Sequence, residues 1–507
     1  MAEEIFDLFI VGGGINGAGI ACDASGRGLK VGLAEMGDFA GATSSASTKL
    51  IHGGLRYLEY YEFRLVREAL AEREVLLRKA PHIIWPLRFV LPHEPHLRPS
   101  WMIRIGLFLY DHIGGRMSLP KSQSVSLQGT EWGVGLKPQY RKGFVYSDCW
   151  VDDARLVVFN LMQAREKGAA IFPRQRVVGA QREKAESSEL WRIELEDVAS
   201  GARSTHRARG LVNAAGPWVR QLFGHLADVK PGNNVRLVKG SHIVVPRQHP
   251  GRHAFILQNK DNRIVFVIPY ERDFTLIGTT DIPYEGEPHA VKISAEETDY
   301  LCAIASDYLA RPVTAADVVW SYSGVRPLYD DGSDNPSAVT RDYVFELDAE
   351  NGKTPLLSIY GGKITTYREL AERALAKLKP FYPSMGAAWT AKAAIPGGDL
   401  EGGDFDSFVA ALPARYPAVP PDLLRALARR HGSNIHRVLA GVGAAAELGQ
   451  HFGGQLYARE VEHFMREEWA VEAQDVLFRR SKEGLHMTQA GREKVAEFMA
   501  ARRRNAS

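Results

Sequence analysis

Cysteine is scarce in this chain. Only Cys22, Cys149 and Cys302 occur among 507 residues, and they lie far apart. An odd number of cysteines at such spacings forms neither a disulfide framework nor a paired-cysteine metal site. The sequence therefore predicts no metal centre, and it indicates a protein of a reducing compartment.

Long apolar runs are missing as well. No stretch approaches the roughly 18 apolar residues that a membrane-spanning helix needs. The first residues, Met1–Glu4, are acidic, whereas a secretory leader begins with basic residues and a mitochondrial transit peptide is rich in arginine. We therefore expect neither a leader nor a spanning helix, although the protein can still bind a membrane surface.

The chain has no excess of one charge. Lys and Arg total 63 and Asp and Glu total 60, which gives a formal charge of +3 and argues against a nucleic-acid partner. Hydrophobic residues make up 45% and charged residues 24%, as in ordinary soluble proteins. A chain of this length can build a large core and forms about two or three domains.

The first 35 residues carry the pattern of a strand, a glycine-rich turn and a helix. The apolar run Ile5–Val11 is followed by Gly12-Gly13-Gly14-Ile15-Asn16-Gly17 and a helical stretch that extends to Ser25. Gly12, Gly14 and Gly17 fit the GxGxxG pattern, in which the turn and the helix N-terminus approach a pyrophosphate. Glu35 ends the second strand, where a carboxylate can bind a ribose. The pattern predicts a dinucleotide and leaves FAD and NAD open.

Later segments favour FAD. Strands that end in glycine occur at 211–217 and 360–363, which suggests that the chain returns to one site after long excursions. A permanently bound flavin needs more contacts than a diffusible nicotinamide. Between these segments, Arg236–Val245, Arg263–Pro269 and Phe274–Thr279 are typical of antiparallel strands.

We therefore predict an α/β fold in which a Rossmann-like FAD-binding domain carries an inserted, mostly antiparallel β-sheet substrate domain and is followed by an all-α C-terminal domain. Residues 81–100 are rich in proline and are predicted to be irregular. The FAD-dependent region comprises residues 1–385, with FAD-binding segments at about 1–80, 145–230 and 345–385 and substrate segments at about 81–144 and 231–344. The helical domain comprises residues 386–507.

Nine segments together make the sequence recognisable. They are Gly12–Gly19, Thr43–Ser45, Lys49–Leu58, Tyr146–Leu156, Lys239–His242, Gly278–Asp281, Gly324–Pro327, Thr340–Tyr343 and Gly361–Tyr367. Through them the chain resembles, over essentially its whole length, the bacterial membrane-associated FAD-dependent glycerol-3-phosphate dehydrogenases. It departs from that family at Ala215, where members often have threonine, and it lacks the EF-hand loop of mitochondrial relatives.

The resemblance implies oxidation of sn-glycerol 3-phosphate to dihydroxyacetone phosphate by hydride transfer to FAD, with electrons passed to a membrane quinone. It implies a cytoplasmic protein bound peripherally to a lipid surface, the inner face of the bacterial membrane. Ubiquinone is the first candidate for the quinone and a homodimer for the assembly, and both stay open. The residues it places at FAD are Gly12, Gly14, Asn16, Gly17, Glu35, Thr43, Ser44, Ser45, Lys49, His52, Gly53, Ala215, Gly216, Gly361, Gly362, Lys363 and Ile364.

A phosphate substrate calls for arginine, whose planar fork binds pairs of oxygens. The resemblance places Arg56, Arg326 and Arg341 around the substrate, with Tyr57 as a hydrogen-bond donor. His242 is the first candidate for the proton acceptor, because an imidazole titrates in the useful range, and Arg326 or a water held near it is the competing assignment.

Lys363 follows two glycines, where a cation can stabilise the reduced flavin or reach the substrate. The residues expected to take part in catalysis are thus His242, Arg326 and Lys363.

The segment Trp101–Tyr110 combines aromatic, aliphatic and arginine residues, which suits either a helix at a lipid interface or one packed on the substrate domain. Three other functions remain as alternatives. They are a glycerol-3-phosphate oxidase that uses O₂, an amino-acid or sarcosine-oxidase-like flavoenzyme, and a flavin-binding protein without turnover.

Overall fold

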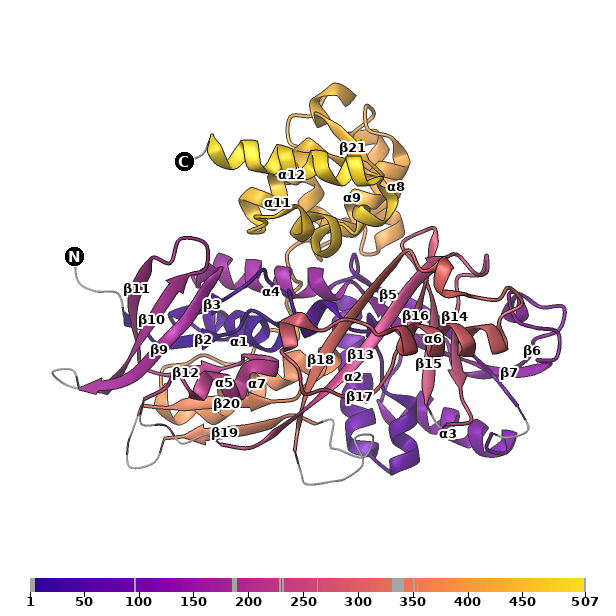
Figure 1. Cartoon of the computed structure of the whole chain (residues 1–507), viewed down its shortest axis with the longest axis horizontal. Helices are drawn as coiled ribbons and strands as arrows, with labels where there is room; N and C mark the ends of the chain where they lie inside the picture. The colour runs from indigo at the N-terminus through magenta and orange to yellow at the C-terminus, as the bar shows by residue number, and fades with distance from the viewer. Residues whose placement is uncertain are drawn as a thin grey trace.

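A computed structural model describes residues 5–94, 97–184, 189–227, 229, 232–261, 263–330, 342–349, 352 and 354–505. Its N-terminal part is built on a six-stranded sheet with the order β19-β20-β12-β2-β3-β8 (Figure 1). The strands are β2 (Leu8–Val11), β3 (Val31–Glu35), β8 (Ala170–Pro173), β12 (Leu211–Asn213), β19 (Val344–Asp348) and β20 (Leu356–Tyr360). All neighbours are parallel except β19 and β20. The predicted Rossmann-like arrangement is confirmed.

Helices α1 (Ile15–Gly26), α4 (Asp153–Glu166) and α7 (Tyr367–Leu378) share one hydrophobic core with this sheet. Glycines let α1 lie close to its neighbours, since a Cβ at Gly17 would lie 1.9 Å from the Gly12 carbonyl oxygen. The opposite side of the sheet packs on a second core that the sequence did not predict. That core belongs to a four-stranded sheet of β1 (Ile5–Phe6), β11 (Arg203–Ala208), β10 (Glu189–Asp197) and β9 (Gln175–Lys184).

The inserted domain is a ten-stranded, mostly antiparallel sheet, as predicted. Successive residues of β13 (Val235–Pro246) point to opposite faces of the sheet. Ile243 packs with helix α6 (Ala295–Tyr308), and Val244 packs in the core that includes α2 (Phe63–Lys79) and α3 (Ser100–Ile113). The strands are β4 (Leu50–Ile51), β5 (Ile84–Pro92), β6 (Gln123–Ser126), β7 (Lys142–Val151), β13 (Val235–Pro246), β14 (Ala254–Gln258), β15 (Ile264–Tyr270), β16 (Phe274–Gly278), β17 (Ile282–Pro283) and β18 (Trp320–Tyr329).

One prediction in this domain is wrong. Residues 81–100 were expected to be irregular, but β5 pairs with β7 from Ile84 to Pro92. The prolines are tolerated because β14, on the other side of β5, pairs only with Phe89 and Val90. Pro86 and Pro92 therefore need no amide donor toward a second strand.

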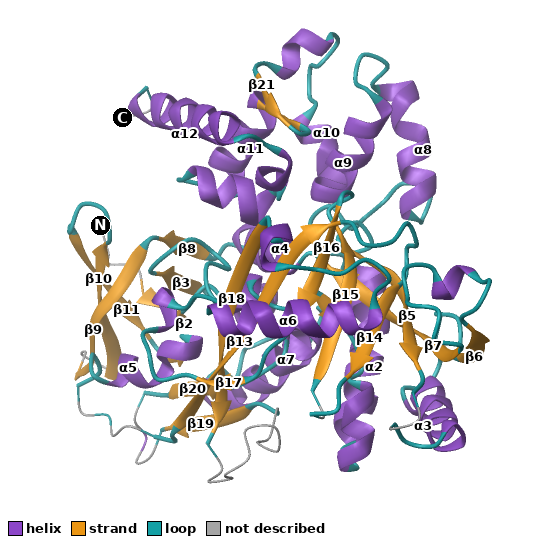
Figure 2. Ribbon diagram, turned by 45° about the vertical axis from the view of Figure 1, so that its right-hand side comes forward, coloured by secondary structure: helices purple, strands orange, loops and turns teal. Residues whose placement is uncertain are grey.

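The C-terminal part is helical, as predicted, and lies over α4 (Figures 1 and 2). Buried ion pairs join it to the FAD-binding part, including Arg155 with Glu468 and Arg480 with Asp38. The sequence missed a short hairpin of β21 (His451–Gly453) and β22 (Leu456–Tyr457). The helices are α8 (Phe405–Arg415), α9 (Pro421–His431), α10 (Ile435–Val438), α11 (Ala458–Glu467) and α12 (Gln489–Arg504). Within the described ranges, no helix has both the length and the apolar character that crossing a membrane requires.

Candidate active site

The glycine-rich turn between β2 and α1 has the conformation that a dinucleotide site needs. Gly12 has a φ of +109°, and a Cβ there would lie 2.5 Å from the Ala214 carbonyl oxygen. Glu35 accepts hydrogen bonds from the amides of Gly13 at 2.7 Å and Gly37 at 2.8 Å. Burial raises the pKa of Glu35, and these two amide bonds work against that rise. The carboxylate thus fixes the turn, and each oxygen keeps a lone pair for a ligand.

The chain returns to this turn 345 residues later. Gly361 and Gly362 follow β20 with φ values of +75° and +101°, and Asn16 Nδ2 donates to the Gly361 carbonyl at 3.1 Å. Asn16 Oδ1 is buried and has no hydrogen-bond partner among the described residues. A buried acceptor without a donor costs about 1–3 kcal/mol unless a ligand supplies one. This oxygen and the glycine turn together fit a dinucleotide such as FAD.

The Ser/Thr-rich loop lies beside the start of α1. Ser44 Oγ accepts from the Ile15 amide at 2.9 Å, and Thr43 Oγ1 donates to the Val325 carbonyl at 2.6 Å. Lys49 Nζ is buried and donates to Asp153 at 2.8 Å and to the Ser45 carbonyl at 2.9 Å. The Lys49 ammonium therefore braces the loop, and its predicted contact with FAD stays a prediction.

Other predicted cofactor residues also have roles in bracing the backbone. The Gly53 amide donates to Tyr110 Oη at 2.8 Å, and the His52 amide donates to Thr365 Oγ1 at 3.3 Å, next to Ile364. The Ala215 amide donates to Asn213 Oδ1 at 3.3 Å. A Cβ at Gly216 would meet nothing within 4 Å, so space is open above this turn.

His242 lies on β13, opposite Gly278 of β16 and Tyr322 of β18. Its ring stacks on Tyr322 with centroids 4.8 Å apart, and Nε2 is 3.0 Å from Thr48 Oγ1. Burial lowers the pKa of His242 well below its usual value, and the charges of Lys49 and Arg326 lower it further. The imidazole is therefore neutral near pH 7. Its Nδ1 has no hydrogen-bond partner in the part of the chain that is described.

Arg326 lies on the neighbouring strand β18, close enough for its charge to act on His242. Its Nη2 donates to Asp281 Oδ1 at 2.6 Å and to the Thr280 carbonyl at 3.2 Å. These contacts hold the guanidinium at the loop that follows β16.

Lys363 and Tyr57 form a second group, with Nζ 3.9 Å from the centre of the Tyr57 ring. Arg56 lies next to Tyr57, with Nε 4.0 Å from a Glu59 oxygen. Arg341 lies outside the described residues.

A buried carboxylate that was not expected from the sequence links the segments that carry His242 and Arg326. Glu297 of α6 accepts from Ser241 Oγ at 2.8 Å and from Thr280 Oγ1 at 2.7 Å, and its other oxygen lies 2.7 Å from Lys239 Nζ. Burial raises the pKa of Glu297, but Lys239 and the hydrogen-bond donors outweigh burial and lower it. Glu297 therefore stays ionised. It ties the residue before His242 to the loop that holds Arg326, and only the capping pattern at Ser294 hinted at it.

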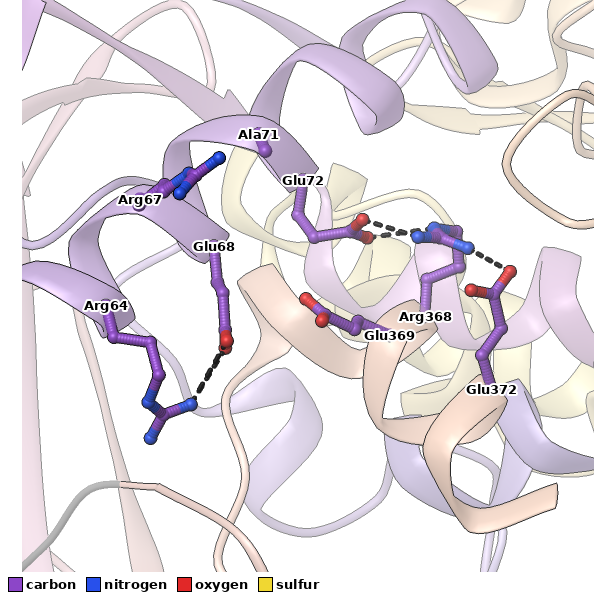
Figure 3. Close-up of a pocket in the computed structure, with 8 residues that line it drawn as sticks. All are labelled: Arg64, Arg67, Glu68, Ala71, Glu72, Arg368, Glu369 and Glu372. Atoms are coloured by element: carbon purple, nitrogen blue, oxygen red, sulfur yellow. Dashed lines mark hydrogen bonds and ion pairs between the residues drawn. The ribbon is translucent and has the colours of Figure 1, made fainter. Parts of the chain in front are cut away.

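A cleft of about 400 Å³ opens elsewhere, between α2 and α7 (Figure 3). Two pairs of its charged groups bond to each other: Arg368 Nε donates to Glu72 at 2.9 Å, and Arg64 Nη1 donates to Glu68 at 3.1 Å. The cleft contains none of the predicted site residues, and we assign it no ligand. It is lined by Arg64, Arg67, Glu68, Ala71, Glu72, Arg368, Glu369 and Glu372.

Comparison with known families gives two matches in succession along the chain. Residues 7–368 match the family described as FAD dependent oxidoreductase. Residues 388–504 match the C-terminal domain of alpha-glycerophosphate oxidase.

Two curated relatives are similar over nearly the whole chain. The aerobic glycerol-3-phosphate dehydrogenase of Escherichia coli K12 is 52% identical over 498 residues, which cover 98% of this chain and 97% of the relative. The D-erythritol 1-phosphate dehydrogenase of Brucella abortus is 53% identical over 499 residues and 98% of both chains. Among solved structures, the glycerol-3-phosphate dehydrogenase of Bacillus halodurans complexed with FAD matches with a TM-score of 0.73 and 26% identity, over 99% of this chain and 95% of that one.

Proposed function

Since the chain belongs to the FAD-dependent oxidoreductases and, among them, to the glycerol-3-phosphate dehydrogenases, we propose that it oxidises sn-glycerol 3-phosphate to dihydroxyacetone phosphate and passes the electrons through FAD to a membrane quinone. The observation that carries the proposal is the association, on adjacent strands, of a neutral buried His242 with the Arg326 guanidinium. A base and a fixed cation are what a phosphorylated alcohol requires.

FAD supplies the hydride acceptor, and the protein positions it. The residues that would hold FAD are the glycine turn at Gly12–Gly17, Glu35, and the Gly361–Gly362 segment. Each presents backbone or a carboxylate where a pyrophosphate or a ribose can approach. The Ser/Thr loop at 43–45 adjoins the same helix N-terminus.

The remaining chemistry falls to side chains of this chain. Arg326 and Arg56 bind the phosphate oxygens, together with Arg341, and Tyr57 donates a hydrogen bond to the substrate. His242 accepts the hydroxyl proton at Nδ1, while Nε2–H donates to Thr48. Lys363, held over the Tyr57 ring, places a positive charge after Gly362.

Substrate choice is tested by steady-state kinetics with two substrates. The relative named for D-erythritol 1-phosphate is as similar to this chain as the one named for glycerol 3-phosphate, so both compounds belong in the assay. With a soluble quinone as acceptor, we expect kcat/KM for sn-glycerol 3-phosphate to exceed that for D-erythritol 1-phosphate by roughly tenfold or more. If kcat/KM is higher for D-erythritol 1-phosphate, the proposed reaction class stands and the proposed substrate is wrong. Turnover with O₂ as fast as with quinone would favour the oxidase alternative.

We also propose that α3 binds the lipid surface. Only Leu107 and Tyr110 of this helix are buried, whereas Trp101 is 63% exposed and Phe108 56% exposed. Two more exposed aromatic residues lie nearby: Tyr61 precedes α2, and Phe63 is its first residue. Helix α2 packs against α3. Large apolar side chains that stay exposed at one edge of a molecule mark an interaction surface.

Replacing Trp101 and Phe108 together by glutamate is expected to weaken binding to vesicles that contain anionic lipid by at least about tenfold, because each buried aromatic contributes roughly 1.5–3 kcal/mol. Co-sedimentation measures this, and anaerobic reduction of the flavin by substrate should be unchanged. The matched control is Val198→Glu, an exposed apolar residue of the FAD-binding part, which should bind vesicles normally. Equal binding by all variants would remove α3 from the membrane surface.

Replacing Glu297 by glutamine is expected to lower kcat by roughly tenfold and to raise KM, because Glu297 positions the residue before His242 and the loop that holds Arg326, and a displacement of about 1 Å can cost up to roughly 10²-fold. The loss should exceed any effect of Glu296→Gln, which alters an exposed neighbour on the same helix. Steady-state kinetics and thermal unfolding are both measured. A lower Tm with an unchanged kcat would leave Glu297 with a purely structural role.

The domain division and the assembly complete the proposal. We place the FAD-dependent region at residues 1–385 and the helical domain at 386–507, in line with family matches that end at 368 and begin at 388. A homodimer is the proposed assembly, and light scattering of the purified protein tests it. A mass near 56.2 kDa, which is that of one chain, would contradict it.

A further inference from the structure

Two histidines and a glutamate converge inside the C-terminal domain, away from every residue assigned above. His431 ends α9, His463 lies on α11, and Glu468 follows α11. All three side chains are buried, with at most 3% exposed. One ligand atom of each lies within 4.8 Å of the other two.

These atoms face one another without bonding. Glu468 Oε1 lies 3.8 Å from His431 Nδ1 and 3.7 Å from His463 Nε2, which is beyond hydrogen-bond reach. Within the described ranges, His431 Nδ1 and both ring nitrogens of His463 have no hydrogen-bond partner. Buried polar atoms are almost always paired, so His431 Nδ1 and His463 Nε2, which both face Glu468 Oε1, call for a missing partner.

The surroundings prepare His431 and Glu468 to act as ligands. His431 Nε2 is 2.7 Å from Glu460 Oε1, so Nε2–H donates to the carboxylate and the Nδ1 lone pair points toward Glu468. Histidines that bind metals usually donate their other ring N–H to a carboxylate in this way. Arg155 Nη2 donates to Glu468 Oε1 at 2.9 Å and fixes the carboxylate, which keeps a second lone pair on that oxygen.

We propose that His431 Nδ1, His463 Nε2 and Glu468 Oε1 bind one Zn²⁺ ion that holds α9 to α11 and, through the Glu468–Arg155 ion pair, to α4. Two imidazoles and a carboxylate are a zinc set, with a water in the fourth position. Ligands about 2.0–2.2 Å from zinc lie roughly 3.3–3.5 Å apart, so each imidazole nitrogen has to move only a few tenths of an ångström toward the Glu468 oxygen, and the two imidazole nitrogens lie within 4.8 Å of each other. The absence of cysteine pairs led us to expect no metal centre, and the ligand set proposed here contains no cysteine.

The test is metal analysis of the full-length flavoprotein. The protein is expressed in medium supplemented with Zn²⁺, because a buried site loads during folding. After dialysis, mass spectrometry of the metal should find about one zinc per chain. Prolonged exposure to EDTA should lower the Tm, and Zn²⁺ added during refolding should restore it.

Variants locate the ion. His463→Gln should lose the zinc and the response of the Tm to EDTA. His249→Gln, which alters a buried histidine of the substrate domain, should keep both. Wild-type protein grown with zinc that contains less than about a tenth of an equivalent, with a Tm indifferent to EDTA, overturns the proposal. So does zinc that persists at full occupancy in His463→Gln. The zinc content of the wild-type protein tests the proposal even where a variant fails to fold.

Discussion

Arg326→Ala is expected to raise KM for sn-glycerol 3-phosphate by roughly 10- to 150-fold. A charge-assisted hydrogen bond contributes about 1.5–3 kcal/mol, and each 1.36 kcal/mol is tenfold in affinity. In the folded protein the guanidinium is held by Asp281 at 2.6 Å and by the Thr280 carbonyl, so the cation is in place before substrate binds. Steady-state kinetics with a quinone acceptor measure the effect.

The control for Arg326 is Arg263→Ala, which removes an arginine that lies immediately before β15, is 47% exposed, and should leave KM unchanged. Arg326→Lys should recover only part of the affinity, since an ammonium cannot bind two oxygens as the guanidinium fork does. If KM and kcat of Arg326→Ala equal those of the wild type, Arg326 does not bind the phosphate.

His242→Gln is expected to slow flavin reduction by about 10²–10⁴-fold, the usual contribution of a general base. Glutamine can keep the contact with Thr48 and the packing on Tyr322, but it accepts no proton near neutral pH. Anaerobic stopped-flow measurement of the flavin band isolates this half-reaction from quinone reduction. His249→Gln serves as the control, because it removes another buried histidine outside the site.

The pH dependence adds a second test of His242. Burial holds the pKa of His242 well below its usual value of about 6.5, so the imidazole stays deprotonated as the pH falls from 8 to 6.5. The rate of flavin reduction should therefore show no loss from this group in that range. Below about pH 6.5 the unfolded chain takes up a proton that folded His242 refuses, so the free energy of unfolding should decrease. If His242→Gln slows flavin reduction by less than tenfold, the proton acceptor is Arg326 or a water beside it, and not His242.

Local pattern was enough to predict the strand, the glycine turn and the helix at the start of the chain. The strand at 8–11, the glycine turn and the helix from Ile15 follow from short-range rules, because GxGxxG constrains only a few adjacent residues. The resemblance to a family then brought Thr43, Gly361 and Lys363 to the same place. In the structure the Thr43 hydroxyl donates a hydrogen bond to the Val325 carbonyl, and the Asn16 side-chain amide donates one to the Gly361 carbonyl.

Long-range pairing was beyond the sequence. Strand β5 was not predicted because its prolines are typical of a loop. They are tolerated because β5 pairs along its length with β7 but with β14 only at Phe89 and Val90. Nothing in the local sequence separates Glu297 from the other glutamates of helices. Its role depends on the fold, which brings it to the hydroxyl groups of Ser241 and Thr280. The convergence of His431, His463 and Glu468 likewise depends on how α9 packs near α11.

The measurement that tests the central claim most directly is an anaerobic titration of the purified flavoprotein with sn-glycerol 3-phosphate, followed by a quinone. We predict that the band near roughly 450 nm of the oxidised flavin bleaches rapidly with substrate and returns when the quinone is added. A yellow protein that does not bleach with sn-glycerol 3-phosphate, while it does bleach with dithionite, would contradict the proposed substrate and leave only the fold and the cofactor standing.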